Sequence, residues 1–381
     1  MWFDWLLLII GMLLLVKGAD YFVDGSSKIA KALRIPSLII GLTLVSMGTS
    51  APELSVSLIA ALENASDLSF GNVVGSDIFN TFFILGVSTF FIPVAISKDM
   101  KKYDIPIMIG LYLLMLLFAF ITSPYKLDAV ESIIFVVLFV SYIALLIYRA
   151  KKNKQEAEES EENSATVKNL FLCVILLAAG VLAWVADFFS KPNLNYVSCI
   201  VMVVFLALML IKIKKPISFK SNKVVMLLNV FFAIAGLFAI VGGGSMVVGS
   251  AKNIAKALGM SEAIIGLTIV AVGTSLPELV TSVVASIKKE NDIAIGNVIG
   301  SNIFNILFIL GISSSISNLK ISEAQAYGIS NSLIDLLVLL VSGLAVMLIS
   351  LFSKNIKKWH GVIFILVYVA YVVYLVMREF A

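Results

Sequence analysis

Two short segments of the chain carry the residues whose types and spacing best suit chemistry. Each reads Gly-Thr-Ser-x-Pro-Glu, and the glutamates that end them are Glu53 and Glu278. The proline has no N–H, so the carbonyl group four residues earlier loses its helical partner and the helix opens there. Free carbonyls, hydroxyls and a carboxylate together form a cluster of hard oxygen atoms. Such clusters suit Na⁺, Ca²⁺ or Mg²⁺ and not zinc or copper, so both segments predict cation binding.

Both glutamates lie in the middle of apolar runs, where a charged side chain is destabilising. A carboxylate at the centre of a membrane helix costs about 2.5–3.5 kcal/mol on insertion scales. A purely structural interpretation would pair each glutamate with a basic residue, but no lysine or arginine falls at the same depth of any apolar run. Lys17, the nearest candidate, lies toward one end of its run. We therefore interpret Glu53 and Glu278 as cation ligands.

A polar stripe follows each segment. Asn72, Ser76 and Asn80 are spaced four residues apart and share one helical face. Gly71 and Gly75 flank them and would let another helix approach closely. The same pattern recurs in the second half as Gly296, Asn297, Gly300, Ser301 and Asn305. For the first asparagine of each stripe, interhelical hydrogen bonding and cation binding both stay open; for the serines and the last asparagines we favour cation binding.

The amino-acid composition indicates in which class of protein these residues are positioned. The chain is 60% hydrophobic and 14% charged, whereas soluble domains are about 45–50% apolar and about 25% charged. A bilayer core of about 30 Å needs roughly 20 apolar residues per helix. We therefore predict an all-α membrane protein with about twelve spans. They lie near residues 3–23, 37–62, 69–93, 104–122, 128–149, 168–189, 195–212, 224–249, 262–287, 293–315, 329–352 and 358–377.

The chain contains an internal repeat. Gly41–Gly86 aligns without a gap with Gly266–Gly311, and more than half of the aligned residues are identical. The same register carries the fourth and fifth spans onto the last two, so each half is a five-helix unit. Because five is odd, the second unit enters the membrane from the opposite face, and inverted repeats of this kind place transport sites at the midplane.

The repeat divides the chain into three parts. Residues 1–150 form the first five-helix unit, residues 224–381 form the second, and residues 151–223 have no counterpart in either. This middle part begins with a charged loop from Lys151 to Glu162, which we interpret as a solvated loop. Two further spans follow it, and an inserted two-helix hairpin keeps the orientation of the second half.

The distribution of basic residues predicts the orientation. About three-quarters of the 28 lysines and arginines fall on one side of the twelve spans, and the positive-inside rule makes that side cytoplasmic. Both termini are then outside the cell, in a protein of the cell membrane whose first apolar run is a retained helix. A disulfide between Cys173 and Cys199 is not expected. His360, the only histidine, lies beside Trp359 and is interpreted as an interfacial residue.

The paired GTS-x-PE and GN-x-x-GS-x-x-x-N motifs resemble the alpha-repeats of the cation/calcium exchanger superfamily, most of all its prokaryotic sodium/calcium exchanger branch. The resemblance covers both repeats and the ten helices around them. It implies a central Ca²⁺ site formed by the carboxylates of Glu53 and Glu278 and the carbonyls of Thr49 and Thr274. It also implies Na⁺ sites that use Ser50, Ser76, Ser275 and Ser301 with the carbonyls of Ser46 and Ala271, while Asn80 and Asn305 close the centre.

The chain departs from the family pattern at two places. Several members carry an aspartate where Asn305 stands, which leaves potassium dependence and stoichiometry open; the second departure is the inserted hairpin. Asp77, whose counterpart is Asn302, is either a polar packing residue, which we favour, or a partial substitute for that aspartate.

The function that the resemblance implies is Na⁺/Ca²⁺ antiport by alternating access. Two carboxylates balance one Ca²⁺ or two Na⁺, and an empty site with two unpaired charges would be unfavourable to move through the membrane. Ca²⁺/H⁺ antiport and K⁺-dependent Na⁺/Ca²⁺ exchange are the alternatives, with a cation channel less favoured. No protease motif is visible, so no enzyme is expected, and neither is a cofactor or a nucleic-acid partner. The expected partners are the lipid bilayer and the transported Ca²⁺ and Na⁺, with K⁺ or H⁺ in the alternatives.

Overall fold

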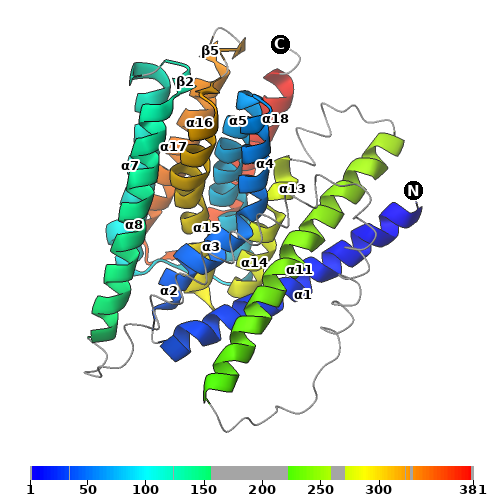
Figure 1. Cartoon of the computed structure of the whole chain (residues 1–381), viewed down its shortest axis with the longest axis vertical. Helices are drawn as coiled ribbons and strands as arrows, with labels where there is room; N and C mark the ends of the chain where they lie inside the picture. Colours follow the sequence, from blue (N-terminus) through cyan, green and yellow to red (C-terminus); the bar gives the residue numbers. More distant parts are fainter. Residues whose placement is uncertain are drawn as a thin grey trace.

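The computed structural model describes residues 2–33, 35–122, 124–155, 222–258, 271–321, 323–326 and 329–378, and within these ranges the chain is mostly helical (Figure 1). The predicted hairpin at 168–189 and 195–212, most of the charged loop and both cysteines lie outside the described residues.

The first half consists of five successive helical segments, several of which change between α-helical and π-helical turns. In chain order its elements are α1 (Trp2–Leu33), α2 (Ser37–Ile40), η1 (Gly41–Val45), α3 (Ser46–Thr49), α4 (Ala51–Leu62), α5 (Ser66–Ile78), η2 (Phe79–Ile84), α6 (Leu85–Phe91), η3 (Met100–Asp104), α7 (Ile105–Leu117), η4 (Phe118–Thr122) and α8 (Ala129–Gln155).

The second half follows the same order where it is described. Its elements are α11 (Asn222–Ala257), α13 (Ala271–Thr274), α14 (Leu276–Ile287), α15 (Asn291–Phe304), η7 (Asn305–Leu310), α16 (Gly311–Ile316), α17 (Asn331–Phe352) and α18 (Lys358–Arg378). Short strands lie at the ends of the bundle: β1 (Val94–Ala95), β2 (Lys126–Leu127), β3 (Leu319–Lys320), β4 (Gln325–Ala326), β5 (Ile329–Ser330) and β6 (Asn355–Ile356).

Among the described residues, eight helices are long and apolar enough to cross a bilayer, and a bent pair, residues 37–49 with 51–62, makes a possible ninth. They match nine of the predicted spans within a few residues, except that α1 continues to Leu33 where the prediction ended at 23, and α11 continues to Ala257 where it ended at 249. Charged residues become frequent beyond residue 23, but Ser26, Ser27 and Ala30 stay buried on one face, so α1 continues as an amphipathic segment. The total of twelve spans stays a prediction.

Helices α1 and α11 lie side by side and run obliquely across the other helices (Figure 1). Glycines at seven-residue intervals bring their backbones together: a Cβ at Gly18 would lie 2.8 Å from the carbonyl oxygen of Gly236, and one at Gly11 would lie 2.8 Å from that of Gly243. Any side chain at these positions would force the helices apart, so close backbone packing makes α1 and α11 a single paired unit.

The centre of the bundle is formed by the helices that carry the polar stripes. Every residue of α15 from Ile293 to Phe304 is buried.

Two strand pairs join the two halves: β1 pairs with β6, with Val94 opposite Ile356, and β2 pairs with β3, with Lys126 opposite Lys320. In each pair, the segment after the stripe helix of one half meets the loop between the last two helices of the other half.

The last two helices of each half are joined by an aspartate–arginine pair. In the first half, Arg149 donates two hydrogen bonds to Asp104, at 2.7 and 3.1 Å, and Asp104 is fully buried. In the second half, Arg378 donates to Asp335 at 2.7 Å, where both side chains are 16% exposed. A tyrosine hydroxyl reaches the aspartate in both pairs, from Tyr142 at 3.4 Å and Tyr371 at 2.8 Å.

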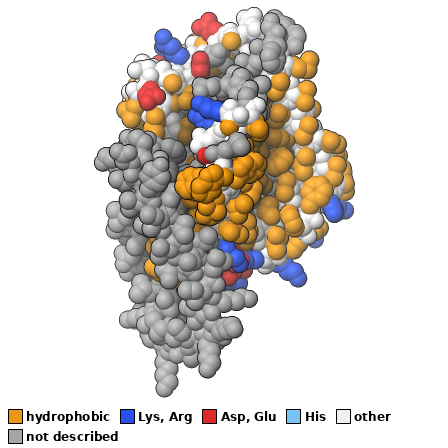
Figure 2. Space-filling model, turned by 90° about the vertical axis from the view of Figure 1, so that its right-hand side faces the viewer, with side chains coloured by type: hydrophobic (Ala, Val, Ile, Leu, Met, Phe, Trp, Pro, Cys, Tyr) orange, Lys and Arg blue, Asp and Glu red, His pale blue; other side chains and the backbone are white. Residues whose placement is uncertain are grey.

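The outer surface is that of a multi-pass membrane protein. Figure 2 shows hydrophobic side chains over the described part of one face, with charged side chains gathered toward its ends. Large apolar side chains are exposed along α8, α17 and α18, among them Val137, Leu348 and Leu366. Exposed apolar surface of this extent is stable only against lipid.

Candidate cation site

The two Gly-Thr-Ser-x-Pro-Glu segments form helix breaks, as predicted from their prolines. The helix axis bends by 48° between α3 and α4, and Ser50 at the break has φ −80° and ψ 10°. Ser275 lies between α13 and α14 with nearly the same backbone angles, φ −90° and ψ 9°. Each serine is the N-cap residue of a helix whose second residue is proline, which places Glu53 and Glu278 in the first turn.

The breaks bring both glutamates into one buried cluster. The Ser275 hydroxyl donates to Oε1 of Glu53 at 2.9 Å, and the Ser50 hydroxyl donates to Oε1 of Glu278 at 2.9 Å. Each carboxylate is thus held by the opposite half. Both side chains are buried, and Oε2 of each has no hydrogen-bond partner among the described residues. Neither forms an ion pair with a lysine or arginine, so the carboxylates have no counter-ion in the part of the chain that the structure describes.

Asn72 and Asn297 hold the helix pairs of the site together. Nδ2 of Asn72 donates to the Glu53 carbonyl oxygen at 3.1 Å and to the Ser57 hydroxyl at 3.0 Å. Nδ2 of Asn297 donates to the Glu278 carbonyl oxygen at 3.3 Å and to the Ser282 hydroxyl at 2.9 Å. These contacts support the interhelical interpretation of the first asparagine in each stripe. Oδ1 of Asn297 is also used, because it accepts a hydrogen bond from the Thr49 hydroxyl at 3.0 Å.

The last asparagines of the stripes stand at the start of the π-helical turns η2 and η7. Nδ2 of Asn80 donates to Oδ1 of Asn302 at 3.1 Å, and Nδ2 of Asn305 donates to Oδ1 of Asp77 at 2.8 Å. The amide oxygens Oδ1 of Asn80 and Asn305, in contrast, have no hydrogen-bond partner among the described residues. Both oxygens are buried and can accept a cation.

Asp77 occupies the same place in this hydrogen-bonding pattern as Asn302, which supports its interpretation as a polar packing residue. The surroundings of the two residues differ, however. Asn302 donates to the Thr81 hydroxyl at 2.7 Å and to the Tyr112 hydroxyl at 2.9 Å. Oδ2 of Asp77 has no partner among the described residues, although the side chain is buried. Asp77 therefore leaves a third buried carboxylate oxygen beside the cluster.

The remaining predicted ligands differ in whether their oxygen atoms already have a hydrogen-bond partner. The Ser76 hydroxyl lies 3.1 Å from the Ser275 hydroxyl and is the donor of this contact, because the single hydrogen of Ser275 is used by Glu53. The buried hydroxyls of Ser301 and Thr274 have no described partner. The Thr49 hydroxyl also lies 3.1 and 3.3 Å from the carbonyl oxygens of Val45 and Ser46, which compete with Oδ1 of Asn297 for its single hydrogen. Ala271 is the first residue of α13, and its role as a carbonyl ligand stays a prediction.

The donor set consists of oxygen atoms. No group of three or more His, Cys, Asp and Glu residues that could hold a metal occurs in the described parts of the chain. A cation here would therefore be held by two carboxylates together with carbonyl, amide and hydroxyl oxygens, which suits Na⁺ and Ca²⁺. The sequence prediction missed Tyr112, Thr81, Ser57 and Ser282. The two serines carried a detectable signal, because each lies four residues after a site glutamate and shares its helical face.

Long apolar helices around a buried cluster of oxygen atoms are the architecture of a membrane transporter for cations, and the similarity of the chain to known proteins agrees with this class. The chain belongs to the sodium/calcium exchanger protein family, whose model matches residues 3–148 and 228–377. The family predicted from the repeated motifs is thereby confirmed.

Individual relatives cover nearly the whole chain. It is 33% identical over 372 residues to the sodium/calcium exchanger MaX1 of Methanosarcina acetivorans, covering 98% of both chains. It is 32% identical to the inner membrane protein YrbG of Escherichia coli, covering 82% of this chain and 79% of the relative. A solved structure of the sodium-calcium exchanger NCX_Mj has the same fold, with a TM-score of 0.71 and 25% identity, covering 96% of this chain and 97% of that one.

Proposed function

We propose that the protein is a secondary antiporter that exchanges Na⁺ for Ca²⁺ across the cell membrane by alternating access and needs no resident cofactor. The observation that carries the proposal is the pair of buried glutamates, each held by a serine of the opposite half and each with one carboxylate oxygen unpartnered. Membership of a sodium/calcium exchanger family supports the same ions.

In this proposal Ca²⁺ is the substrate of the central site. Its ligands are the carboxylates of Glu53 and Glu278 and the carbonyls of Thr49 and Thr274. Na⁺ ions use the hydroxyls of Ser50, Ser76, Ser275 and Ser301 and the carbonyls of Ser46 and Ala271, and the amide oxygens of Asn80 and Asn305 close the centre. The unpartnered oxygens of Ser301, Asn80 and Asn305 support these roles.

The charge of the site explains why transport would be an exchange. Two buried carboxylates with no described counter-ion are unfavourable, because burying charge without a partner is destabilising. One Ca²⁺ or two Na⁺ neutralise them, so either loaded form can cross the barrier while the empty form cannot. A proton on each glutamate would also neutralise the site, which keeps Ca²⁺/H⁺ antiport as the second candidate. Asp77 supports a third, K⁺-dependent exchange, since a third negative charge beside Ca²⁺ would call for one monovalent cation.

We further propose that residues 1–150 and 224–381 are inverted five-helix repeats, with residues 151–223 inserted between them. The support lies in contacts that occur in equivalent pairs. The asparagine bonds to a glutamate carbonyl and the Asp–Tyr–Arg clusters occur once within each half, and the serine–glutamate bonds and the strand pairs each join the halves twice, with the roles of the halves exchanged. The moving unit would be α1 with α11, because their backbones are in contact and neither carries a Gly-Thr-Ser-x-Pro-Glu segment. Both termini would lie outside the cell.

The test is ⁴⁵Ca²⁺ uptake by purified protein in liposomes, with Na⁺, K⁺ and pH gradients imposed separately. We expect an outward Na⁺ gradient alone to drive uptake, and Glu53→Gln and Glu278→Gln each to abolish it because half of the balancing charge is lost. Glu63→Gln is the matched control, since Glu63 is an exposed acid at the end of the same helix as Glu53. Uptake driven only by the pH gradient would favour Ca²⁺/H⁺ exchange, and full activity in either site variant would refute the two-glutamate site.

A further inference from the structure

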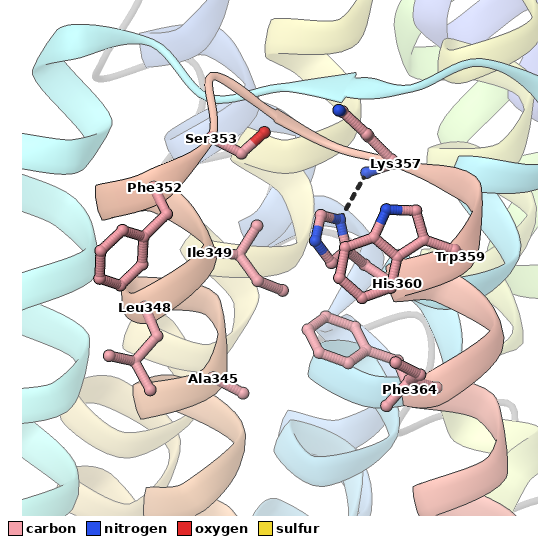
Figure 3. A pocket seen from close by; sticks show the side chains of 10 residues that line it. Ala345, Leu348, Ile349, Phe352, Ser353, Lys357, Trp359, His360 and Phe364 are labelled. Carbon is pink, nitrogen blue, oxygen red and sulfur yellow. Dashed lines mark hydrogen bonds between the residues drawn. The ribbon is translucent and has the colours of Figure 1, made fainter.

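A groove opens on the lipid-facing surface between the last two helices of the chain, far from the cation site. It has a volume of about 530 Å³ and is lined by Ala345, Leu348, Ile349 and Phe352 of α17, by Trp359, His360, Ile363 and Phe364 of α18, and by Ser353 and Lys357 of the loop between them. Figure 3 shows apolar side chains of the two helices facing each other while this loop closes one end. The volume falls within the range of about 300–1,000 Å³ typical of small-molecule sites.

The apolar part of the groove follows the helix axes. Ala345, Leu348 and Phe352 line one wall and span about 10 Å of helix at 1.5 Å per residue. Phe352 is 88% exposed and Leu348 is 55% exposed, so this wall faces the bilayer. A slot of this kind, which runs from the membrane surface toward the midplane and is lined by aliphatic and aromatic side chains, matches the shape and chemistry of an acyl chain.

The closed end of the groove carries positive charge and hydrogen-bond donors. Lys357 lines this end, Lys354 and Lys358 close to it in the chain are also exposed, and the Lys357 side chain extends beyond the loop, away from the apolar slot (Figure 3). Nδ1 of His360 accepts a hydrogen bond from the Lys357 backbone N–H at 2.9 Å. In the neutral ring the proton is then on Nε2, which becomes a donor on the groove side. The indole of Trp359 adds an N–H at the depth where tryptophan lies in membrane interfaces.

Charge around the groove also decides between a lipid and a second copy of the chain. No aspartate or glutamate occurs from Leu336 to Arg378, and the neighbouring strand β1 is followed by Lys98, Lys101 and Lys102 with Asp99 as the only acid. Asp99 lies 3.7 Å from Arg149. A symmetric contact between two copies on this patch would set lysines against lysines, whereas an anionic headgroup complements them.

We propose that this groove is a binding site for one anionic phospholipid. The phosphate and acidic headgroup lie against Lys357, Lys358 and the N–H groups of His360 and Trp359, and one acyl chain lies in the slot between α17 and α18. The lipid would seal the outer side of the hairpin whose loop strand, β6, pairs with β1 of the first half, so occupancy would stabilise the contact between the two halves at this end.

The test measures lipid retention by the purified full-length protein, using native mass spectrometry with phosphatidylglycerol or phosphatidylcholine added. We expect one phosphatidylglycerol to be retained preferentially, and the double variant Lys357→Gln/Lys358→Gln to bind it about thirtyfold more weakly, as two surface lysines predict. The matched control is Lys126→Gln/Lys320→Gln, which removes two exposed lysines from the strand pair β2–β3 and should leave retention unchanged. Thermal stabilisation by phosphatidylglycerol should decrease in the first variant only.

A second variant tests the slot without changing charge. Ala345→Leu fills the lower end of the groove and should weaken retention of phosphatidylglycerol while leaving folding and uptake intact. Equal retention of the two lipids, equal loss in both lysine variants, or undiminished retention in Ala345→Leu would each overturn the site. A dimer that dissociates when phosphatidylglycerol is absent or Lys357 is replaced would assign the groove to a second copy and would also overturn it.

Discussion

One end of α1 is fastened to the core by a charged cluster, and breaking it should shift the conformational equilibrium of the transporter. Lys288, in the turn after α14, lies 2.6 Å from Asp20 and 2.6 Å from Asp24 of α1. Two residues later, Glu290 accepts from the Ser27 hydroxyl at 2.6 Å and from Lys31 at 3.0 Å. If α1 and α11 slide over the core during transport, these contacts exist in only one of the two end states.

By the repeat register, the ion pairs of Lys288 have no equivalent at the opposite end. The residue equivalent to Lys288 is Glu63, and those equivalent to Asp20 and Asp24 are Ser245 and Gly249. In the proposed alternating-access cycle these ion pairs would therefore stabilise one end state without an equivalent set in the other. The side chain of Lys288 is 21% exposed while its partners are about half exposed, and exposed pairs contribute about 0.2–1 kcal/mol each. We expect Lys288→Gln to change the ratio of the two states about fivefold, which corresponds to about 1 kcal/mol.

The populations can be measured with spin labels at Trp5 on α1 and Leu62 at the end of α4, both exposed, after Cys173 and Cys199 are replaced by serine. Lys288→Gln should transfer population from the distance seen in this structure to the other state, as should 1 M salt, which screens exposed charges over about 3 Å. Lys289→Gln is the matched control, because Lys289 is the exposed neighbour of Lys288. Identical distance distributions in the wild type and Lys288→Gln would refute the reasoning.

The same cluster gives a pH dependence with a defined sign. Burial alone would raise the pKa of Glu290, but the hydrogen bond from Ser27 and the charge of Lys31 outweigh burial and hold the pKa below its usual value of 4.5. A lowered pKa means that the contribution of Glu290 is complete above about pH 4.5 and is lost as the pH falls through the lowered value. The population shift should therefore be constant through neutral pH and change only under acidic conditions.

Three further predictions concern packing and the site. Arg149→Met should reduce the free energy of unfolding by about 3–5 kcal/mol, because it leaves the buried Asp104 unpaired. Arg378→Met should reduce it less, because its partner Asp335 is partly exposed. Equal losses of unfolding free energy in SDS titrations of the two variants would contradict this. Asp77→Asn should keep Ca²⁺ uptake within about twofold of the wild type, since its amide oxygen can still accept the hydrogen bond from Asn305. Asp77→Ala should lower uptake, because it leaves the buried Asn305 amide without an acceptor, at a cost in stability of about 1–3 kcal/mol. Gly18→Leu should separate α1 from α11 and abolish uptake, while Gly110→Leu, which has no described neighbour within 4 Å, should not.

The helix breaks could be predicted because the sequence carries the same proline signal twice, once in each half. Pro52 and Pro277 each predict a helix break, and the structure places breaks at Ser50 and Ser275. The contacts that escaped prediction join residues far apart in the chain. Asp104 and Arg149 are 45 residues apart, and nothing local marks their pairing. The same Asp, Tyr and Arg recur at corresponding positions in the second half, so a comparison of the two halves beyond the motifs would have revealed them.

The glycines of the two stripes illustrate the limit of a prediction made from spacing alone. A Cβ at Gly296 would lie 3.0 Å from Cα of Gly41, and one at Gly300 would lie 2.7 Å from the hydroxyl oxygen of Ser46, so close approach is confirmed in the second half. A Cβ at Gly71 or Gly75 would meet no described atom within 4 Å. By the repeat register their neighbours would come from residues 263–271, most of which lie outside the described residues, so the prediction is untested there.

The proposed site is not symmetric, although the two halves of the chain that form it are similar. Ser50 and Ser275 make equivalent bonds to the opposite glutamates, so the central pair of carboxylates offers the same surroundings to a cation from either half. The hydroxyls of Thr81 and Tyr112 accept hydrogen bonds from the side-chain amide of Asn302. The residue that corresponds to Tyr112 in the second half is Gly343, which has no hydroxyl and packs against the Tyr112 ring. Asp77 therefore has no hydroxyl to occupy Oδ2. One flank of the centre is neutral with its amide hydrogens bonded, while the other carries an unpartnered carboxylate oxygen, so the two flanks of the proposed site offer different surroundings although the central carboxylates are equivalent.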